Sequence, residues 1–270
     1  MKRAGNPLVD THFHPPPEVD PAVYAGEAQD AGVAGLLAVG ADPAECGRAR
    51  DFAAAAPGAW FSAGIHPHAA GDWDNDLAPF AEYAANPRFV AVGEIGLDYY
   101  YEHAAPSTQR RVLSQFLEFA MTVERPVILH VRDRENQDAA YRDLFAAAGG
   151  FLAGGGRAGL HCYTGTVAWA ERFLAEGAFL GVTGIVTFPR GENVREVVRL
   201  IPPERLLLET DSPYLAPIPH RGKPNHSRYL PEIARRVAAE RGMTLESLAA
   251  TTTENACRLF GIPVPEKTDE

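Results

Sequence analysis

The chain alternates short apolar runs with segments of helical periodicity. The runs with the length and composition of strands are residues 7–12, 34–40, 60–65, 89–94, 126–131, 158–162, 178–183 and 206–210. Apolar residues occupy both faces of these runs, which is typical of parallel strands buried on both sides. Between the runs the periodicity predicts helices, most clearly over residues 107–124, whose apolar face is formed by Val112, Phe116, Ala120 and Val123.

The last part of the chain, residues 228–260, has the pattern of two helices. Gly242 is expected to end the first, and the run T-T-T-E at 251–254 predicts the start of the second, which Gly261 ends. Eight strand and helix units in about 250 residues predict an α/β fold, a (β/α)8 TIM barrel with C-terminal helices. No linker or internal repeat is evident, so residues 1–270 are expected to form one domain.

A glycine-rich run, G-G-G-R-A-G at 154–159, has the spacing of a dinucleotide-binding loop. It follows a predicted helix and precedes a predicted strand, which is the reverse of the order that a dinucleotide-binding fold needs. We therefore predict a turn at the non-catalytic end of the barrel.

Composition and charge limit the compartment and the partners. The three cysteines are scattered without close pairing, and neither a signal peptide nor a membrane-spanning run is evident, so a cytoplasmic protein without a membrane partner is expected. The net charge of −10 argues against a protein that holds nucleic acid mainly through a basic surface. Two bound divalent cations would add four positive charges locally, so a phosphodiester substrate remains compatible with this acidity.

Histidines and carboxylates follow the predicted strands. In V-D-T-H-F-H-P-P-P, His12 and His14 share one face of a strand that the prolines end. At or just after the ends of later strands stand His66, His68, Glu94, His130, His161 and Asp211. These positions lie at the carboxyl ends of the strands, where barrel enzymes build their active sites.

Each of these residues also has an ordinary structural interpretation. A single strand-end histidine is more often hydrogen-bonded than metal-bound, Glu94 could pair with a buried arginine, and Asp211 could cap a helix. His66 and His68, with a proline between them, could orient the substrate or brace their loop. Four imidazoles and two carboxylates at one barrel mouth nevertheless favour a metal site.

Six nitrogen and oxygen ligands are too many for one tetrahedral zinc and suit two divalent ions. We expect His12, His14 and Asp211 to bind one ion, and His130 and His161 to bind the other, with Glu94 between them. Asp211 would take a proton from the attacking water. The candidate catalytic residues are therefore Asp211, Glu94 and His66.

Cationic and polar residues near the same ends indicate the substrate. The run P-H-R-G-K-P-N follows the eighth strand, where barrels often bind anions, although a solvated loop is the alternative. The expected substrate contacts are His66, His68, Arg132, Arg221 and Asn225, and Lys223 is a weaker candidate. His103, His220 and His226 are expected to lie outside the metal site.

The chain resembles the TatD-like metal-dependent deoxyribonucleases of the amidohydrolase-like superfamily. The resemblance rests on D-T-H-F-H, G-I-H-P-H, V-G-E-I-G-L-D-Y-Y, P-V-I-L-H-V-R-D, G-L-H-C-Y-T-G, L-L-L-E-T-D-S-P-Y-L-A-P and R-G-K-P-N, in that order, from residue 8 to about 261. It implies a barrel with two divalent ions, magnesium, manganese or zinc, whose ligand positions coincide with His12, His14, Glu94, His130, His161 and Asp211. The family usually has Cys between the first two histidines and Leu-Asp after them, where this chain has Phe13 and three prolines.

The function expected from these observations is cleavage of DNA phosphodiester bonds by a metal-activated hydroxide. The resemblance implies a 3′-5′ exonuclease on single-stranded DNA, with a role in DNA repair. An alternative keeps the site but changes the bond, as in a deacylase or amidohydrolase that acts on an ester or amide such as an aminoacyl-tRNA. A non-catalytic binding protein would be expected to have lost ligands, and none is missing. The sequence leaves the oligomeric state open and is compatible with a monomer.

Overall fold

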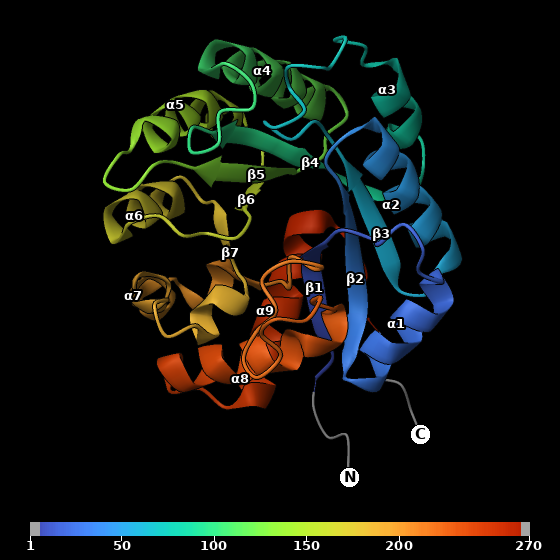
Figure 1. Ribbon diagram of the computed structural model, residues 1–270, viewed down its shortest axis with the longest axis vertical. Coiled ribbons are helices and arrows are strands. Elements are labelled where there is room, and N and C mark those ends of the chain that lie inside the picture. The colour runs from blue at the N-terminus through green and yellow to red at the C-terminus, as the bar shows by residue number, and fades with distance from the viewer. Residues whose placement is uncertain (1–5, 266–270) are drawn as a thin grey trace.

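Eight parallel strands form the centre of the structure, a computed structural model that describes residues 6–265 (Figure 1). They are β1 (Leu8–Phe13), β2 (Val33–Gly40), β3 (Ala59–Ala63), β4 (Phe89–Asp98), β5 (Val127–Arg132), β6 (Ala158–Leu160), β7 (Phe179–Val182) and β8 (Leu206–Leu208). Each strand pairs with the next in chain order. A bridge between Phe13 and Ser212 brings the end of β8 back to β1, so the barrel is nearly closed.

Helices surround the sheet in Figure 1. They are α1 (Pro21–Asp30), α2 (Pro43–Ala55), α3 (Ala78–Ala84), α4 (Pro106–Thr122), α5 (Ala139–Ala153), α6 (Val167–Ala175), α7 (Glu192–Leu200), α8 (Leu230–Arg241) and α9 (Leu245–Phe260). The predicted TIM barrel with C-terminal helices is confirmed. Across residues 6–265, no helix combines the length and apolar character that crossing a membrane requires. The expected absence of a signal peptide rests on the first ten residues, of which residues 1–5 lie outside the described part, as do the last five residues of the expected domain.

Two apolar clusters pack against the sheet, one between the strands and the surrounding helices and the other inside the barrel. In the outer one, Phe13 is fully buried and packs against Tyr24 of α1 and Phe52 of α2. Inside the sheet, Leu37 and Leu207 pack against Phe260 of α9. Because α9 contacts both β1 and β8, it covers one end of the interior and leaves the opposite end for a site.

The predicted start of the last helix is wrong. The last helix begins at Leu245, where Thr244 caps it by accepting a hydrogen bond from the Ser247 amide, so T-T-T-E at 251–254 lies within α9. There the Thr252 hydroxyl donates to the Leu248 carbonyl instead of capping an end. The predicted turn at 154–159 is confirmed in position, because residues 154–157 connect α5 to β6.

The sequence predicted that Glu94 ends its strand. In the structure β4 continues to Asp98, so Glu94 lies within the strand. Gly96 makes this continuation possible. It pairs in register with His130 of β5 at φ 152°, and a Cβ at this position would lie 2.0 Å from the His130 carbonyl oxygen. Only glycine allows so close an approach between the two strands.

Candidate active site

A cavity of about 800 Å3 lies at the carboxyl ends of the strands. Most of the predicted site residues line it, namely His14, His66, His68, Glu94, His130, Arg132, His161 and Asp211. His12 lies fully buried beneath the cavity and reaches the same groups. The barrel therefore brings together side chains that are up to 199 residues apart, as the distance from His12 to Asp211 in the sequence shows.

The Glu94 carboxylate stands at the centre of two groups of donors. Its Oε2 lies 3.4 Å from His12 Nε2 and 3.8 Å from His14 Nε2. Its Oε1 lies 2.9 Å from His130 Nδ1 and 3.2 Å from His161 Nε2. Burial alone would raise the pKa of Glu94, but the surrounding imidazoles lower that pKa well below its ordinary value. Glu94 is thus an ionised bridge between the two groups.

The first group contains His12, His14 and Asp211. The two Nε2 atoms are 3.3 Å apart, and Asp211 Oδ1 lies 3.9 Å from His12 Nε2 and 3.6 Å from His14 Nε2. Ligand atoms at about 2.1 Å from a tetrahedral ion are about 3.4 Å from one another, which is close to these spacings. Burial lowers the pKa of His12, so its ring is neutral and its nitrogen can bind a cation. This donor set fits a divalent metal ion.

The second group contains His130, His161 and the other oxygen of Glu94. Burial alone would lower the pKa of both imidazoles. The Glu94 charge and the neighbouring Glu209 raise the pKa of His161 to about 9, and bonds to Asp98 and Glu94 raise that of His130. In the absence of a cation these rings hold protons against the carboxylates. A metal ion would replace those protons, so binding is expected to release protons.

Three imidazoles of these groups have a second carboxylate at their other nitrogen. Glu45 lies 3.4 Å from His14 Nδ1, Asp98 lies 3.2 Å from His130 Nε2, and Glu209 lies 3.3 Å from His161 Nδ1. In metal proteins such outer carboxylates fix the tautomer and orientation of a ligating histidine. The arrangement therefore resembles that of metal-binding histidines.

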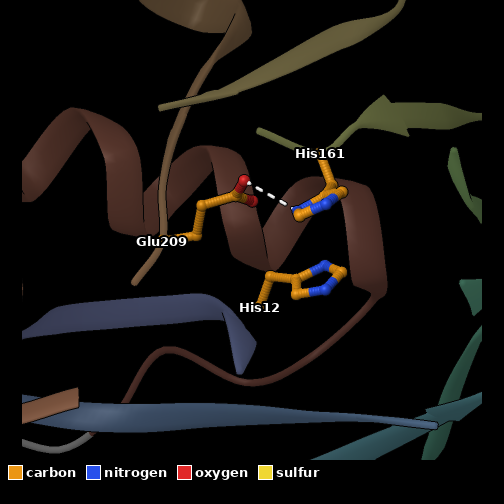
Figure 2. Close-up of side chains that lie close together, drawn as sticks. All are labelled: His12, His161 and Glu209. Carbon is orange, nitrogen blue, oxygen red and sulfur yellow. Dashed lines mark ion pairs between the residues drawn. The ribbon is translucent and has the colours of Figure 1, made fainter. Parts of the chain in front are cut away.

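Figure 2 shows the contact between Glu209 and His161, with the His12 ring beneath. The two rings stack with centroids 3.8 Å apart, and the Nδ1 atoms of both lack an aligned hydrogen bond. Glu209 also accepts hydrogen bonds from the Cys162 amide and, at 3.4 Å, from the Thr11 hydroxyl. Because Glu209 is held from beneath the cavity by these donors, we interpret it as an outer partner of His161.

His66 differs from the other imidazoles of the site. Its Nδ1 accepts a hydrogen bond from the His68 amide at 3.1 Å, while its Nε2 lies 3.6 Å from Glu94 Oε1. Burial lowers the pKa of His66 well below its ordinary value, so the ring is neutral. A neutral ring that accepts at Nδ1 carries its proton on Nε2. His66 is therefore a hydrogen-bond donor into the cavity and a poor metal ligand.

Asp98 connects His130 to His68. Its Oδ2 lies 3.2 Å from His130 Nε2 and 3.0 Å from His68 Nε2. Its Oδ1 accepts hydrogen bonds from the amides of Tyr100 and Tyr101. Burial alone would raise the pKa of Asp98, but the bonds from the two imidazoles lower it below its ordinary value.

Sequence reasoning missed Glu45, Asp98 and Glu209. Two of them had a signal: Glu209 stands two residues before Asp211, and Asp98 four residues after Glu94. Residues that far apart along a strand face the same side. No signal in the sequence pointed to Glu45, because it lies on helix α2 and reaches His14 from outside the sheet.

The expected substrate contacts are placed differently from one another. Arg132 lines the cavity, and its guanidinium lies 4.3 Å from the ring centre of Tyr100. Arg221 does not line the cavity; it lies over Phe188 at 4.0 Å. Asn225 is buried, and its amide donates to the carbonyl oxygens of Thr210 and Tyr214 at 2.8 and 2.6 Å.

The other polar residues considered lie outside the cavity lining. Lys223 is exposed. His220 and His226 are partly exposed, and their rings stack on Tyr229 and Tyr24, respectively. His103 is not part of the cavity lining either, and its ring lies 4.5 Å from that of His68.

The barrel and its histidine and carboxylate centre define a metal-dependent hydrolase. Residues 9–261 match the model of the TatD related DNases, and the chain belongs to this family. The resemblance read from the motifs is therefore confirmed, as is the expectation of a nuclease that hydrolyses phosphodiester bonds.

Similar proteins support this family membership over nearly the whole chain. A protein of Citrobacter rodentium named 3'-5' ssDNA/RNA exonuclease TatD is 39% identical over 241 residues, which cover 87% of this chain and 89% of that protein. The protein of the same name from Escherichia coli K12 is also 39% identical over 241 residues, covering 87% of this chain and 90% of its own. The crystal structure of YJJV, a TatD homologue from Escherichia coli K12, superimposes with a TM-score of 0.84 at 26% identity and covers 95% of this chain and 98% of its own.

Proposed function

We propose that the protein degrades single-stranded DNA from its 3′ end with the help of two divalent metal ions. The observation that carries the proposal is the Glu94 carboxylate, whose two oxygens each face a separate set of imidazoles at the spacing of metal ligands. The names of the two exonuclease relatives support the substrate and the direction. A location in the cytoplasm and a role in DNA repair stay predictions.

In this proposal His12, His14 and Asp211 would hold one ion on the side of the cavity nearest β1 and β8. His130 and His161 would hold the other, and Glu94 would contribute to both. When bound, magnesium, manganese or zinc ions supply Lewis-acid stabilisation of the phosphate charge. The outer contacts of Glu45, Asp98 and Glu209 keep the three paired imidazoles in the orientation that binding requires.

We propose one proton transfer, to Asp211, and one hydrogen bond to the substrate, from His66. The imidazoles of His14, His161 and His12 oppose the effect of burial and lower the pKa of Asp211, so its carboxylate is ionised and can accept a proton from the attacking water. His66 faces the cavity with its proton on Nε2, and this N–H donates a hydrogen bond to an oxygen of the cleaved phosphate while the ring stays neutral. Glu94 takes part by holding the two groups of donors at a fixed separation.

Arg132 and His68 are the proposed substrate contacts beyond the centre, because both line the cavity and Arg132 is the one arginine or lysine among the described residues of that lining. Arg221 and Asn225 are left out of the proposed contacts. Arg221 is turned toward Phe188 and the Ala216 carbonyl, and the Asn225 amide is already bonded on two sides. Asn225 instead holds the loop that carries Tyr214.

The decisive experiment uses metal-stripped protein and a single-stranded oligonucleotide labelled at its 5′ end, with magnesium, manganese or zinc added in turn. We expect a ladder that shortens from the 3′ end, and loss of the ladder in Asp211→Asn. Asparagine tolerates the left-handed backbone of residue 211, where φ is 55°, so this variant is expected to fold. Asp143→Asn is the matched control, because Asp143 pairs with Arg110 and Tyr99 outside the cavity.

Metal content is measured on the same samples by mass spectrometry. Intact DNA with every metal, from protein that holds two ions per chain, would refute the nuclease proposal. Hydrolysis of an aminoacyl ester by that same sample would instead establish the deacylase alternative.

A further inference from the structure

Two exposed tyrosines border the cavity from different elements. Tyr101 is 51% exposed and Tyr214 is 62% exposed, and both line the cavity that holds the centre. Large aromatic rings on a protein surface gain little from contact with water. Their position around a hydrolytic centre therefore indicates a binding surface for something flat and partly apolar.

Both rings are carried by backbone that is held in place. The Tyr214 amide donates to the Asp211 carbonyl at 2.8 Å, and its own carbonyl accepts the Asn225 amide at 2.6 Å. The Tyr101 amide donates to Asp98 Oδ1 at 2.9 Å, and the Arg132 guanidinium lies 4.8 Å from its ring centre. A ring on fixed backbone loses little conformational freedom on binding.

The two tyrosines stand on opposite sides of the centre. Tyr101 follows β4 and Tyr214 follows β8, and in a barrel with strands in the order β1 to β8 these strands face one another. Tyr214 adjoins His14, with ring centres 6.1 Å apart, and Tyr101 adjoins His68, with ring centres 5.4 Å apart. Glu94 and the two groups of donors lie between these two borders of the cavity.

We propose that Tyr101 and Tyr214 are stacking sites for the two nucleobases that flank the cleaved bond. A phosphodiester bound at the centre carries one nucleoside on each side, and the two rings lie on the two sides. Every base offers a flat face, so such stacking is tolerant of sequence. This inference rests on the proposed nuclease function and adds where the bases bind.

The charge of the protein supports this form of binding. With a net charge of −10 the protein as a whole repels a polyanion, and Arg132 is the one arginine or lysine among the described residues that line the cavity. Stacking needs no charge and therefore supplies affinity that the surface potential does not. In a duplex the base faces are covered by neighbouring pairs, so two stacking sites favour single strands over duplexes.

The test compares Tyr101→Leu and Tyr214→Leu with the wild type on single-stranded oligonucleotides. We expect each variant to raise KM about tenfold while kcat changes little, since stacking is worth about 1–3 kcal/mol per base. Tyr101→Phe and Tyr214→Phe keep the ring and are expected to behave like the wild type. Tyr229→Leu is the matched control, because Tyr229 lies partly exposed outside the cavity lining and stacks on His220.

A second set of substrates carries an abasic nucleotide on one or the other side of the terminal bond. If a tyrosine stacks on the missing base, the abasic substrate raises the wild-type KM, and the corresponding leucine variant shows no additional loss on it. Leucine variants with the wild-type KM would overturn the proposal. The proposal would also be overturned if the increases in KM caused by the leucine substitution and by the abasic nucleotide were independent, so that together they multiplied.

Binding without metal separates this proposal from the proposed function. An oligonucleotide with 2-aminopurine next to its 3′ end reports stacking by loss of fluorescence when metal-free protein is added. If the wild type degrades no DNA with any metal, the nuclease function fails, yet quenching that disappears in the leucine variants would still support stacking. Absence of quenching by a wild type that binds the oligonucleotide would overturn the stacking proposal alone.

Discussion

Asp98→Asn tests whether an outer carboxylate controls metal binding at the second group of donors. In the wild type, Oδ2 accepts from the Nε2 atoms of His130 and His68 at 3.2 and 3.0 Å, and Oδ1 accepts from two backbone amides. Asparagine has one accepting oxygen, which we expect to stay with the two amides. Its NH2 group then faces His130 Nε2 and donates to it.

That reversal moves the remaining proton of His130 to Nδ1. This nitrogen lies 2.9 Å from Glu94 Oε1 and is the proposed metal ligand, so the variant protonates the atom that must bind the ion. Loss of an outer partner typically costs 10–100-fold in metal affinity, which corresponds to about 1.4–2.7 kcal/mol. We expect a cost in this range for one ion and little change for the other, because the His12 and His14 group does not contact Asp98.

The assay is competition between the protein and a coloured chelator, analysed for two dissociation constants, together with activity measured against metal concentration. At high metal concentration the weakened site should be fully occupied again, and kcat should then return to the wild-type value. Asp143→Asn again serves as the control, because it removes a carboxylate that contacts Tyr99 and Arg110 but no imidazole of the site. Two dissociation constants within about twofold of the wild type in folded Asp98→Asn protein would refute the reasoning.

Three further predictions concern stability and local geometry. Burial, together with Arg228, lowers the pKa of His226 to about 4, so the stability that this ring contributes is present above about pH 6.5 and lost as the pH falls toward 4. At pH 5 the loss is about 2 kcal/mol, and urea unfolding should show a smaller decrease between pH 7.5 and 5 in His226→Asn; an equal decrease would contradict this. Phe13→Ala should lower the unfolding free energy by about 3–5 kcal/mol, because the ring is fully buried, and a loss below about 1 kcal/mol would be inconsistent with that packing. Gly96→Ala should prevent β4 from approaching β5 and abolish metal binding, so a variant with wild-type metal content and melting temperature would disprove the close approach.

The sequence was sufficient for the architecture because each strand is buried on both faces. Runs such as residues 34–40 and 126–131 contain little but apolar residues, and a parallel strand inside a layer of helices has no polar face to obscure that pattern. The order of strands then follows from short connections, since each strand pairs with the next one in the chain.

The same local patterns were insufficient where a distant contact decides the structure. The predicted strand at 89–94 ends two residues before Gly96, yet β4 continues through Gly96 to Asp98, because the backbone of His130 lies against that glycine. Thr252 looks like part of a helix cap, yet its hydroxyl bonds within α9. Arg221 and Asn225 looked like substrate contacts because their loop is polar, but the direction of a side chain depends on neighbours that a single sequence does not place.

The centre joins the two ends of the barrel, and this has a consequence for synthesis of the chain. His12 and His14 come from β1, while Asp211 follows β8, and the His14 amide donates to the Ser212 carbonyl at 2.7 Å. A ribosome that has released only the first seven strands has made most of the imidazoles but not the acid that completes the first group. Incomplete chains therefore lack the proposed base, and the newly synthesised protein can cleave nucleic acid only after its barrel has closed.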